Sequence, residues 1–98
     1  MSGMNLTMQD IPADQSLIEY PSLFPIKVMG ANVDGFADAV IAVAQRFDPL
    51  LDPAEVESRL SKAGNYRSLT VTITATSREQ LDELYRTLSS HPMVKVVL

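Results

Sequence analysis

One segment near the middle of the chain constrains the fold more than any other. Between residues 66 and 76, apolar side chains alternate with hydroxyl side chains. The apolar set is Leu69, Val71, Ile73 and Ala75, and the hydroxyl set is Ser68, Thr70, Thr72 and Thr74. A two-residue period is typical of a β-strand that is buried on one face only. The segment therefore predicts an antiparallel sheet with one covered face and one polar, open face.

Three further segments have strand character. Residues 23–30 alternate, with Phe24, Ile26 and Val28 on the apolar side. Residues 55–61 alternate more weakly, and residues 93–98 form a β-branched run that reaches the C-terminus. The sequence Ala63-Gly64-Asn65 between two of these segments has the residue types of a tight turn. We therefore expect four strands, two of which form a hairpin.

Two segments have the three- and four-residue spacing of amphipathic helices. We expect the first to begin after an N-cap at Asn32 and to stop at Asp48, because the residue before Pro49 is disfavoured in a helix. The second follows Ser77, which has capping-box spacing to Gln80.

The element order is therefore β-α-β-β-α-β. Right-handed crossovers then place both helices on one face of a four-stranded antiparallel sheet of order 4-1-3-2, which is the ferredoxin-like split-βαβ arrangement of the α+β class. We expect residues 17–98 to form this single domain. Residues 1–16 are predicted to be a flexible tail, because their isolated apolar side chains form no periodic face that offsets the entropy of ordering.

Composition excludes several classes of function. The 98 residues carry a net charge of −4, no Cys and one His, so a thiol nucleophile and thiolate or histidine metal clusters are excluded and no cofactor is expected. The negative charge and an open face without aromatic residues at the strand centres argue against nucleic acid as a partner. No apolar run of about 18 residues and no signal features occur, so we expect a cytoplasmic protein without a membrane partner.

Two polar segments are candidate binding elements. We expect Gly30-Ala31-Asn32 to open the first helix, where free amides can hold a carboxylate, although the glycine can also serve only to make a turn. Residues 64–68 form a polar hairpin that presents two side-chain hydroxyls. Together with a lysine on the open face, the candidate ligand- or partner-binding residues are Lys27, Gly30, Asn32, Gly64, Asn65, Tyr66 and Ser68. We expect none of them to have a catalytic or metal-binding role.

Charged side chains are expected to pair at the surface. The spacing of Asp82 and Arg86 predicts an i,i+4 ion pair. A cationic group near the hairpin comprises Arg59, Lys62 and Arg67. We expect this group to pair with Glu55 and Glu57, and the alternative is that it holds an acidic partner.

Several short motifs resemble the YbeD-type family of small uncharacterised bacterial proteins. They include Glu19-Tyr20-Pro21 followed by Phe24, Lys27-Val28-Met29-Gly30, Gly64-Asn65-Tyr66 followed by Ser68, and Val94 with Val97-Leu98. The resemblance covers residue 17 to the C-terminus and departs at Ala63, where relatives often carry Lys. It implies a ferredoxin-like fold similar to the small-molecule-sensing ACT domains. In those domains the glycine loop after the first strand, here Gly30 and Asn32, meets ligand. No activity is implied.

The leading hypothesis is a non-catalytic regulatory or protein-interaction module, with ACT-like sensing of a small molecule as one form of it. A rival is an acylphosphatase-like hydrolase, although the segment from Val28 to Gly35 lacks the arginine that such a loop needs and carries Asp34. A third hypothesis is a structural subunit of a larger complex. The polar open face predicts a monomer, or a weak homodimer paired through an edge strand.

Overall fold

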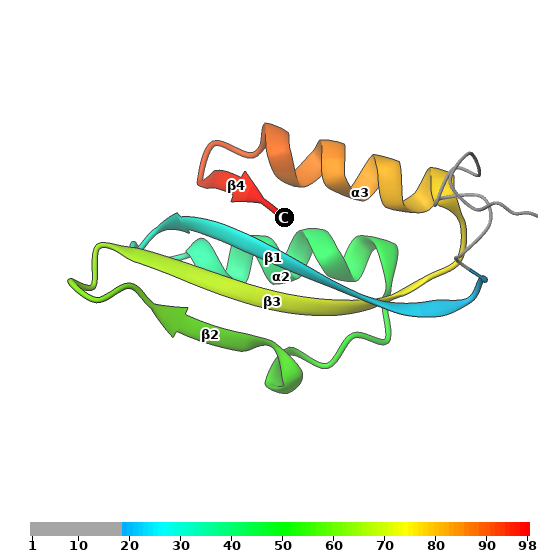
Figure 1. Ribbon diagram of the computed structural model, residues 1–98, viewed down its shortest axis with the longest axis horizontal. Coiled ribbons are helices and arrows are strands. Elements are labelled where there is room, and N and C mark those ends of the chain that lie inside the picture. Colours follow the sequence, from blue (N-terminus) through cyan, green and yellow to red (C-terminus); the bar gives the residue numbers. More distant parts are fainter. Residues whose placement is uncertain (1–18) are drawn as a thin grey trace, which may run out of the picture.

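A computed structural model describes residues 19–98, and the tail predicted over residues 1–16 lies outside them. Along the chain the elements are β1 (Ser22–Ala31), α2 (Phe36–Phe47), the 3-10 turn η1 (Pro53–Glu55), β2 (Glu57–Leu60), β3 (Tyr66–Ala75), α3 (Arg78–Ser90) and β4 (Val94–Val97). The predicted β-α-β-β-α-β order is therefore confirmed (Figure 1). The strands pair antiparallel in the order β2-β3-β1-β4, which is the predicted 4-1-3-2 order counted from the opposite edge.

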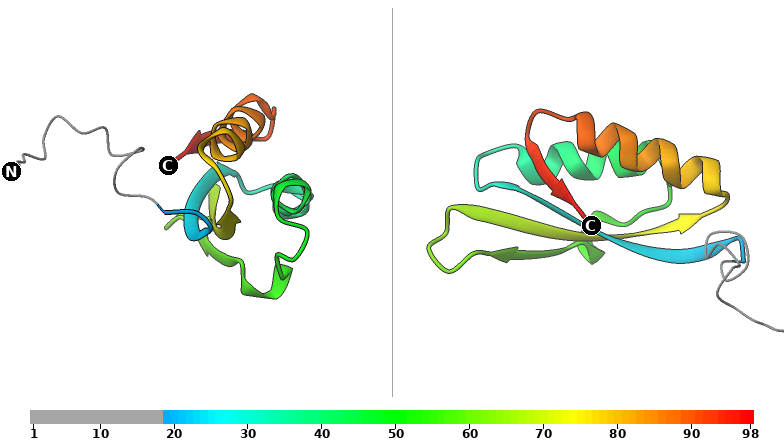
Figure 2. Two further views of the ribbon diagram at one scale, coloured as in Figure 1. Left: turned by 90° about the vertical axis from the view of Figure 1, so that its right-hand side faces the viewer. Right: turned by 45° about the horizontal axis from the view of Figure 1, so that its top comes forward.

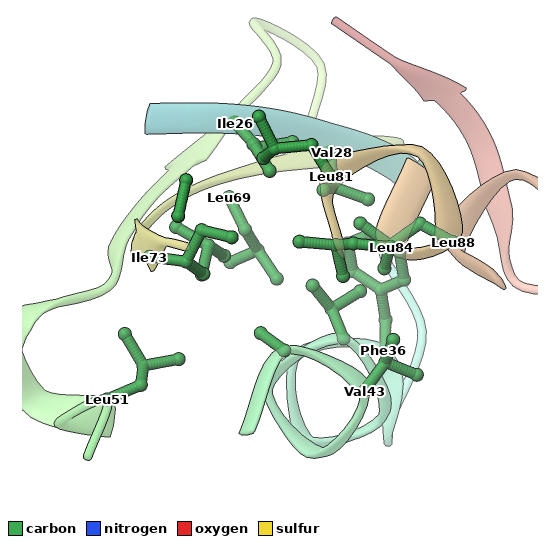
Figure 3. Packing of buried hydrophobic residues seen from close by; sticks show 14 residues of the cluster. Ile26, Val28, Phe36, Val43, Leu51, Leu69, Ile73, Leu81, Leu84 and Leu88 are labelled. Carbon is green, nitrogen blue, oxygen red and sulfur yellow. The ribbon is translucent and has the colours of Figure 1, made fainter. Parts of the chain in front are cut away.

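Both helices pack on one face of the sheet, and no other element of residues 19–98 covers the opposite face (Figure 2). The core lies between these two layers. Its buried side chains come from alternate positions of β1 and β3, from one stripe on each helix and from Leu51 in the loop after α2 (Figure 3). The predicted apolar face of β3 is confirmed, because Leu69, Val71, Ile73 and Ala75 are all buried. This one-sided burial produces the open polar face on which the candidate site lies.

The start of α2 differs from the sequence prediction. The helix begins at Phe36, and its N-cap is Gly35, which has φ 87° and provides no side-chain cap. Asn32, the predicted N-cap, follows directly after β1, which pairs with β3 as far as Ala31 opposite Tyr66. Tertiary strand pairing therefore extends β1 and delays the helix, a competition that a local capping signal does not report.

The end of α2 and the start of α3 agree with prediction, and one glutamine side chain joins them. Helix α2 ends at its C-cap Asp48, and the Ser77 hydroxyl accepts the Gln80 backbone N–H at 3.0 Å. The Gln80 side chain reaches one residue beyond the expected box, accepting the Thr76 N–H at 2.7 Å and donating to the Phe47 carbonyl at 3.0 Å. Gln80 thus connects α2 to the start of α3.

Two smaller features of the structure differ from the sequence predictions. The predicted Asp82–Arg86 pair does not form, because Arg78 contacts Asp82 at 3.2 Å and Arg86 contacts Glu83 at 2.7 Å. Residues three and four apart are both neighbours on a helix, so Arg86 has two carboxylates in reach, Asp82 and Glu83. The second strand is also shorter than the predicted 55–61. The 3-10 turn η1 includes Glu55, and β2 begins only at Glu57.

Candidate binding groove on the open sheet face

The open face carries the side chains that alternation predicted for it. The register places Lys27 and Glu57 on either side of Thr70, in one row across β1, β3 and β2. The next row consists of Met29, Ser68 and Arg59. Residues in one row of adjacent strands have neighbouring Cβ atoms, so the two rows form one continuous polar surface.

These rows line a groove of about 650 Å³, which we call the open-face groove. Its lining residues are Lys27, Glu57, Ser58, Arg59, Ser68 and Thr70. The volume lies within the ~300–1,000 Å³ that small-molecule sites occupy. The lining combines two cations, one carboxylate and several hydroxyls, a set of groups that suits a ligand carrying both signs of charge.

The cations of the groove have no carboxylate within ion-pair distance in the described part of the chain, where both ion pairs lie on α3. The expected pairing of Arg59, Lys62 and Arg67 with Glu55 and Glu57 was therefore wrong. Exposed ion pairs gain only ~0–1 kcal/mol against the cost of fixing two long side chains, so a favourable charge pattern alone does not form them. Lys27 and Arg59 remain available to a ligand.

Asn32 joins the end of β1 to the β2–β3 hairpin. Its backbone N–H donates to the Asn65 carbonyl at 2.9 Å, and its Nδ2 donates to the Gly64 carbonyl at 3.0 Å. Arg67 donates from Nε to the Asn32 Oδ1 at 3.2 Å and from Nη1 to the Ser58 hydroxyl. Asn32, Gly64 and Asn65, which are candidates from two separate segments, are therefore brought together, and Arg67 joins them.

Gly30 lies inside β1, not in a loop, and it is buried. A Cβ at this position would lie 2.3 Å from the Met93 carbonyl oxygen and 2.5 Å from Cε1 of Phe36. The expectation that Gly30-Ala31-Asn32 opens the helix was wrong, because β1 continues through Ala31. Close packing of β1 against α2 and the turn before β4 accounts for the glycine, and a binding role for it stays a prediction.

Of the predicted site residues, Lys27 and Ser68 line the open-face groove. Glu57, Arg59 and Thr70 lie on the same face by strand alternation but were not among the predicted site residues. The alternation of side chains along each strand indicates which residues share a face. Only the register between strands, which aligns Thr70 and Glu57 with Lys27, shows that they form one site.

The single histidine has a structural role at the end of α3. His91 is the C-cap, and its Nδ1 accepts the Met93 backbone N–H at 3.1 Å. Within residues 19–98, no cluster of three or more His, Cys, Asp or Glu side chains is placed to hold a metal ion. None of the helices in this range has the length and apolar character that a membrane crossing requires.

Comparison with known proteins identifies the family. Residues 15–98 match the profile of a protein of unknown function, DUF493. The chain belongs to this family. It is 69% identical over 91 residues to a UPF0250 protein of Leptothrix cholodnii, covering 93% of this chain and 100% of the relative. It is 60% identical over 91 residues to a UPF0250 protein of Bordetella parapertussis, with the same coverage. The YbeD-type resemblance is confirmed.

Solved structures support the fold. A solution structure of protein HP0495 from H. pylori is similar with a TM-score of 0.69 at 19% identity, covering 90% of this chain and 94% of that chain. The solution structure of the ACT domain from GTP pyrophosphokinase of Chlorobium tepidum is similar with a TM-score of 0.62 at 17% identity, covering 79% and 83%. At these identities the likeness concerns the fold alone.

Proposed function

We propose that this protein is a non-catalytic regulatory module of the cytoplasm that senses a small zwitterionic molecule of the amino-acid class in its open-face groove. The observation that carries the proposal is the charge pattern of the groove, with Lys27 and Arg59 on the same surface as Glu57. The fold likeness to an ACT domain supports a sensing role.

The side chains of the groove match the two charged ends of such a ligand. A guanidinium holds a carboxylate through two parallel hydrogen bonds, and Lys27 adds a second positive charge. The Glu57 carboxylate complements the ligand ammonium. The hydroxyls of Ser68 and Thr70 each donate or accept a hydrogen bond, so they can orient a bound polar group.

The geometry around Asn32 favours binding over hydrolysis. An acylphosphatase-like reaction requires an asparagine amide that is free to hold the attacking water, and both ends of the Asn32 amide are engaged within the protein. Nucleophilic catalysis also requires a nucleophile beside a base, and His91 instead caps α3. These contacts support a module that binds without turnover.

The test is a thermal-shift and NMR titration of the full chain with glycine, acetate and methylamine. Glycine is expected to bind more tightly than either single-charge fragment, because only glycine engages both signs of charge. A ligand at 100 times its Kd adds about 2.7 kcal/mol, which corresponds to roughly 10–20 °C in Tm for a domain of this size.

Arg59→Ala and Lys27→Ala are the site variants, and Lys62→Ala is the matched control, since Lys62 is an exposed cation of the same hairpin outside the groove. Losing a charged hydrogen bond costs ~1.5–3 kcal/mol, so the site variants should raise the Kd about 10- to 150-fold, and the control should leave it unchanged. Equal binding by all three variants, or no saturable shift with any compound, would refute the proposal.

A further inference from the structure

A second, smaller pocket adjoins the open-face groove at its hairpin end. We call it the hairpin pocket; it has a volume of about 170 Å³, and its apolar side chains on the open face are Met29 and Tyr66. Arg59 and Ser68 line both the pocket and the groove, so the two hollows are continuous. The polar surface therefore ends in an apolar recess.

The apolar side chains of this recess are not accounted for by the core. Tyr66 is 48% exposed, although it lies on a face of hydroxyls and charges. Leu60 pairs with Arg67, so its side chain points to the other face of the sheet. In the strand register Met29 faces Ser68 and Ala31 faces Tyr66, so Met29 and Tyr66 are diagonal neighbours on the open face. Keeping these side chains in water loses the free energy that their burial would provide, which favours an apolar occupant.

From this continuity we infer that the hairpin pocket receives the side chain of the ligand, and that the ligand is an amino acid with one aromatic or branched aliphatic side chain. The inference rests on the proposed function, because it requires the charged end of the ligand to lie between Lys27, Glu57 and Arg59. The volume agrees with this assignment, since an apolar cavity of ~150 Å³ accommodates benzene. A long or multiply charged side chain does not match the pocket.

The geometry also assigns a role to Arg59 at the junction. Its side chain lines both hollows, so its guanidinium can hold the ligand carboxylate while the ligand side chain extends toward Tyr66. Ser68, opposite Arg59 in the register, lies at the same junction and can hydrogen-bond the carboxylate or the ammonium. The open-face groove thus binds the charged end of one small molecule, and the adjoining hairpin pocket binds its apolar end.

The experiment is an NMR titration of the full chain with phenylalanine, leucine, serine and glycine as probes. Complete burial of a leucine or phenylalanine side chain strengthens binding roughly 10- to 150-fold. Because this pocket is open, we expect phenylalanine and leucine to bind at least about tenfold more tightly than glycine. Serine should bind about as weakly as glycine. Backbone signals of Lys27 and Thr70 report the groove, and those of Tyr66 report the hairpin pocket.

Three variants separate a ring contact from a general change in the sheet. Tyr66→Ala should reduce the preference for phenylalanine over glycine to less than threefold without changing the Kd for glycine, and Tyr66→Phe should keep the preference. Leu23→Ala is the matched control, because Leu23 is an apolar side chain of the same face of β1, 73% exposed and outside both hollows. It should change neither Kd.

The outcomes distinguish a failure of the hairpin-pocket assignment from a failure of amino-acid binding in the groove. If glycine binds the groove as tightly as phenylalanine does, the assignment of the hairpin pocket is overturned and the proposed function stands. If Tyr66→Ala retains the full preference, the pocket assignment is likewise overturned. If no amino acid shifts the signals of Lys27 or Thr70, the proposed function itself fails, and the assignment of the ligand fails with it.

Discussion

Substitution of Gly30 by alanine should destabilise the protein strongly, although alanine is the smallest change available and strands accept it. Gly30 lies between the aromatic ring of Phe36 and the backbone carbonyl of Met93. A Cβ would lie 2.3 Å from the Met93 oxygen, 2.5 Å from Cε1 of Phe36 and 2.9 Å from its Cζ. Carbon atoms in contact normally stay ~3.5–4.0 Å apart, so the ring would have to move by about 1 Å.

Neither neighbour can move cheaply. Phe36 is fully buried at the first turn of α2, and the Met93 carbonyl belongs to the backbone directly before β4. Overpacking of a well-packed core costs ~1–3 kcal/mol, and two opposed contacts place this site at the upper end, about 3 kcal/mol. For a domain of this size that corresponds to a loss of roughly 12–24 °C in Tm.

Urea denaturation followed by far-UV circular dichroism measures the change, with Gly64→Ala as the matched control. Gly64 has φ 79°, and no atom lies within 4 Å of the place that a methyl group would take, so its substitution costs only the ~1–2 kcal/mol of left-handed backbone. Adding Phe36→Leu to Gly30→Ala should recover part of the loss, because the shorter side chain relieves one contact. A Gly30→Ala protein within about 0.5 kcal/mol of wild type would refute the close-packing argument.

Two further predictions concern the helices. Gln80→Ala should lower the free energy of unfolding by about 1–2 kcal/mol, because the Thr76 N–H and the Phe47 carbonyl both lose their side-chain partner. Urea titration measures this change, with the exposed Glu79→Ala as the control. Equal loss of stability in the two variants would contradict the prediction. Burial raises the pKa of the Tyr85 phenol, so its stabilising contribution is complete below about pH 10 and is lost as the pH rises through the raised pKa of the folded state. Tyr85→Phe should therefore lose less stability than wild type between about pH 9 and pH 11, and parallel pH profiles would show that reasoning to be wrong.

Local patterns determined much of the fold because β1, β3, α2 and α3 each have one buried face. The alternation around Leu69, Val71 and Ile73 predicted β3 and its open side, and the Ser77 capping signal predicted the start of α3. The stop of α2 at Asp48 followed from the proline after it. Such signals act between residues close in sequence, so they survive in any tertiary context that preserves the core.

Failures occurred where distant segments compete for the same atoms. The side chain of Asn32 has the chemistry of an N-cap, but its Oδ1, the atom that would accept from the helix amides, accepts from Arg67 Nε instead. The ion pairs failed for a related reason, because spacing indicates which charges are near one another and not which contact outweighs the entropy of ordering the side chains.

By itself, then, the sequence determined the class of fold, the polar character of the open face and the absence of thiol chemistry, because these depend on periodicity and residue type. Only the tertiary structure decided that Lys27, Glu57 and Arg59 form one groove and that Met29 and Tyr66 close its end. A shift of one residue in strand register would keep every local pattern of β2 and separate these side chains, since neighbouring positions point to opposite faces of a sheet. The candidate site is thus a property of the pairing between strands, and no strand contains it alone.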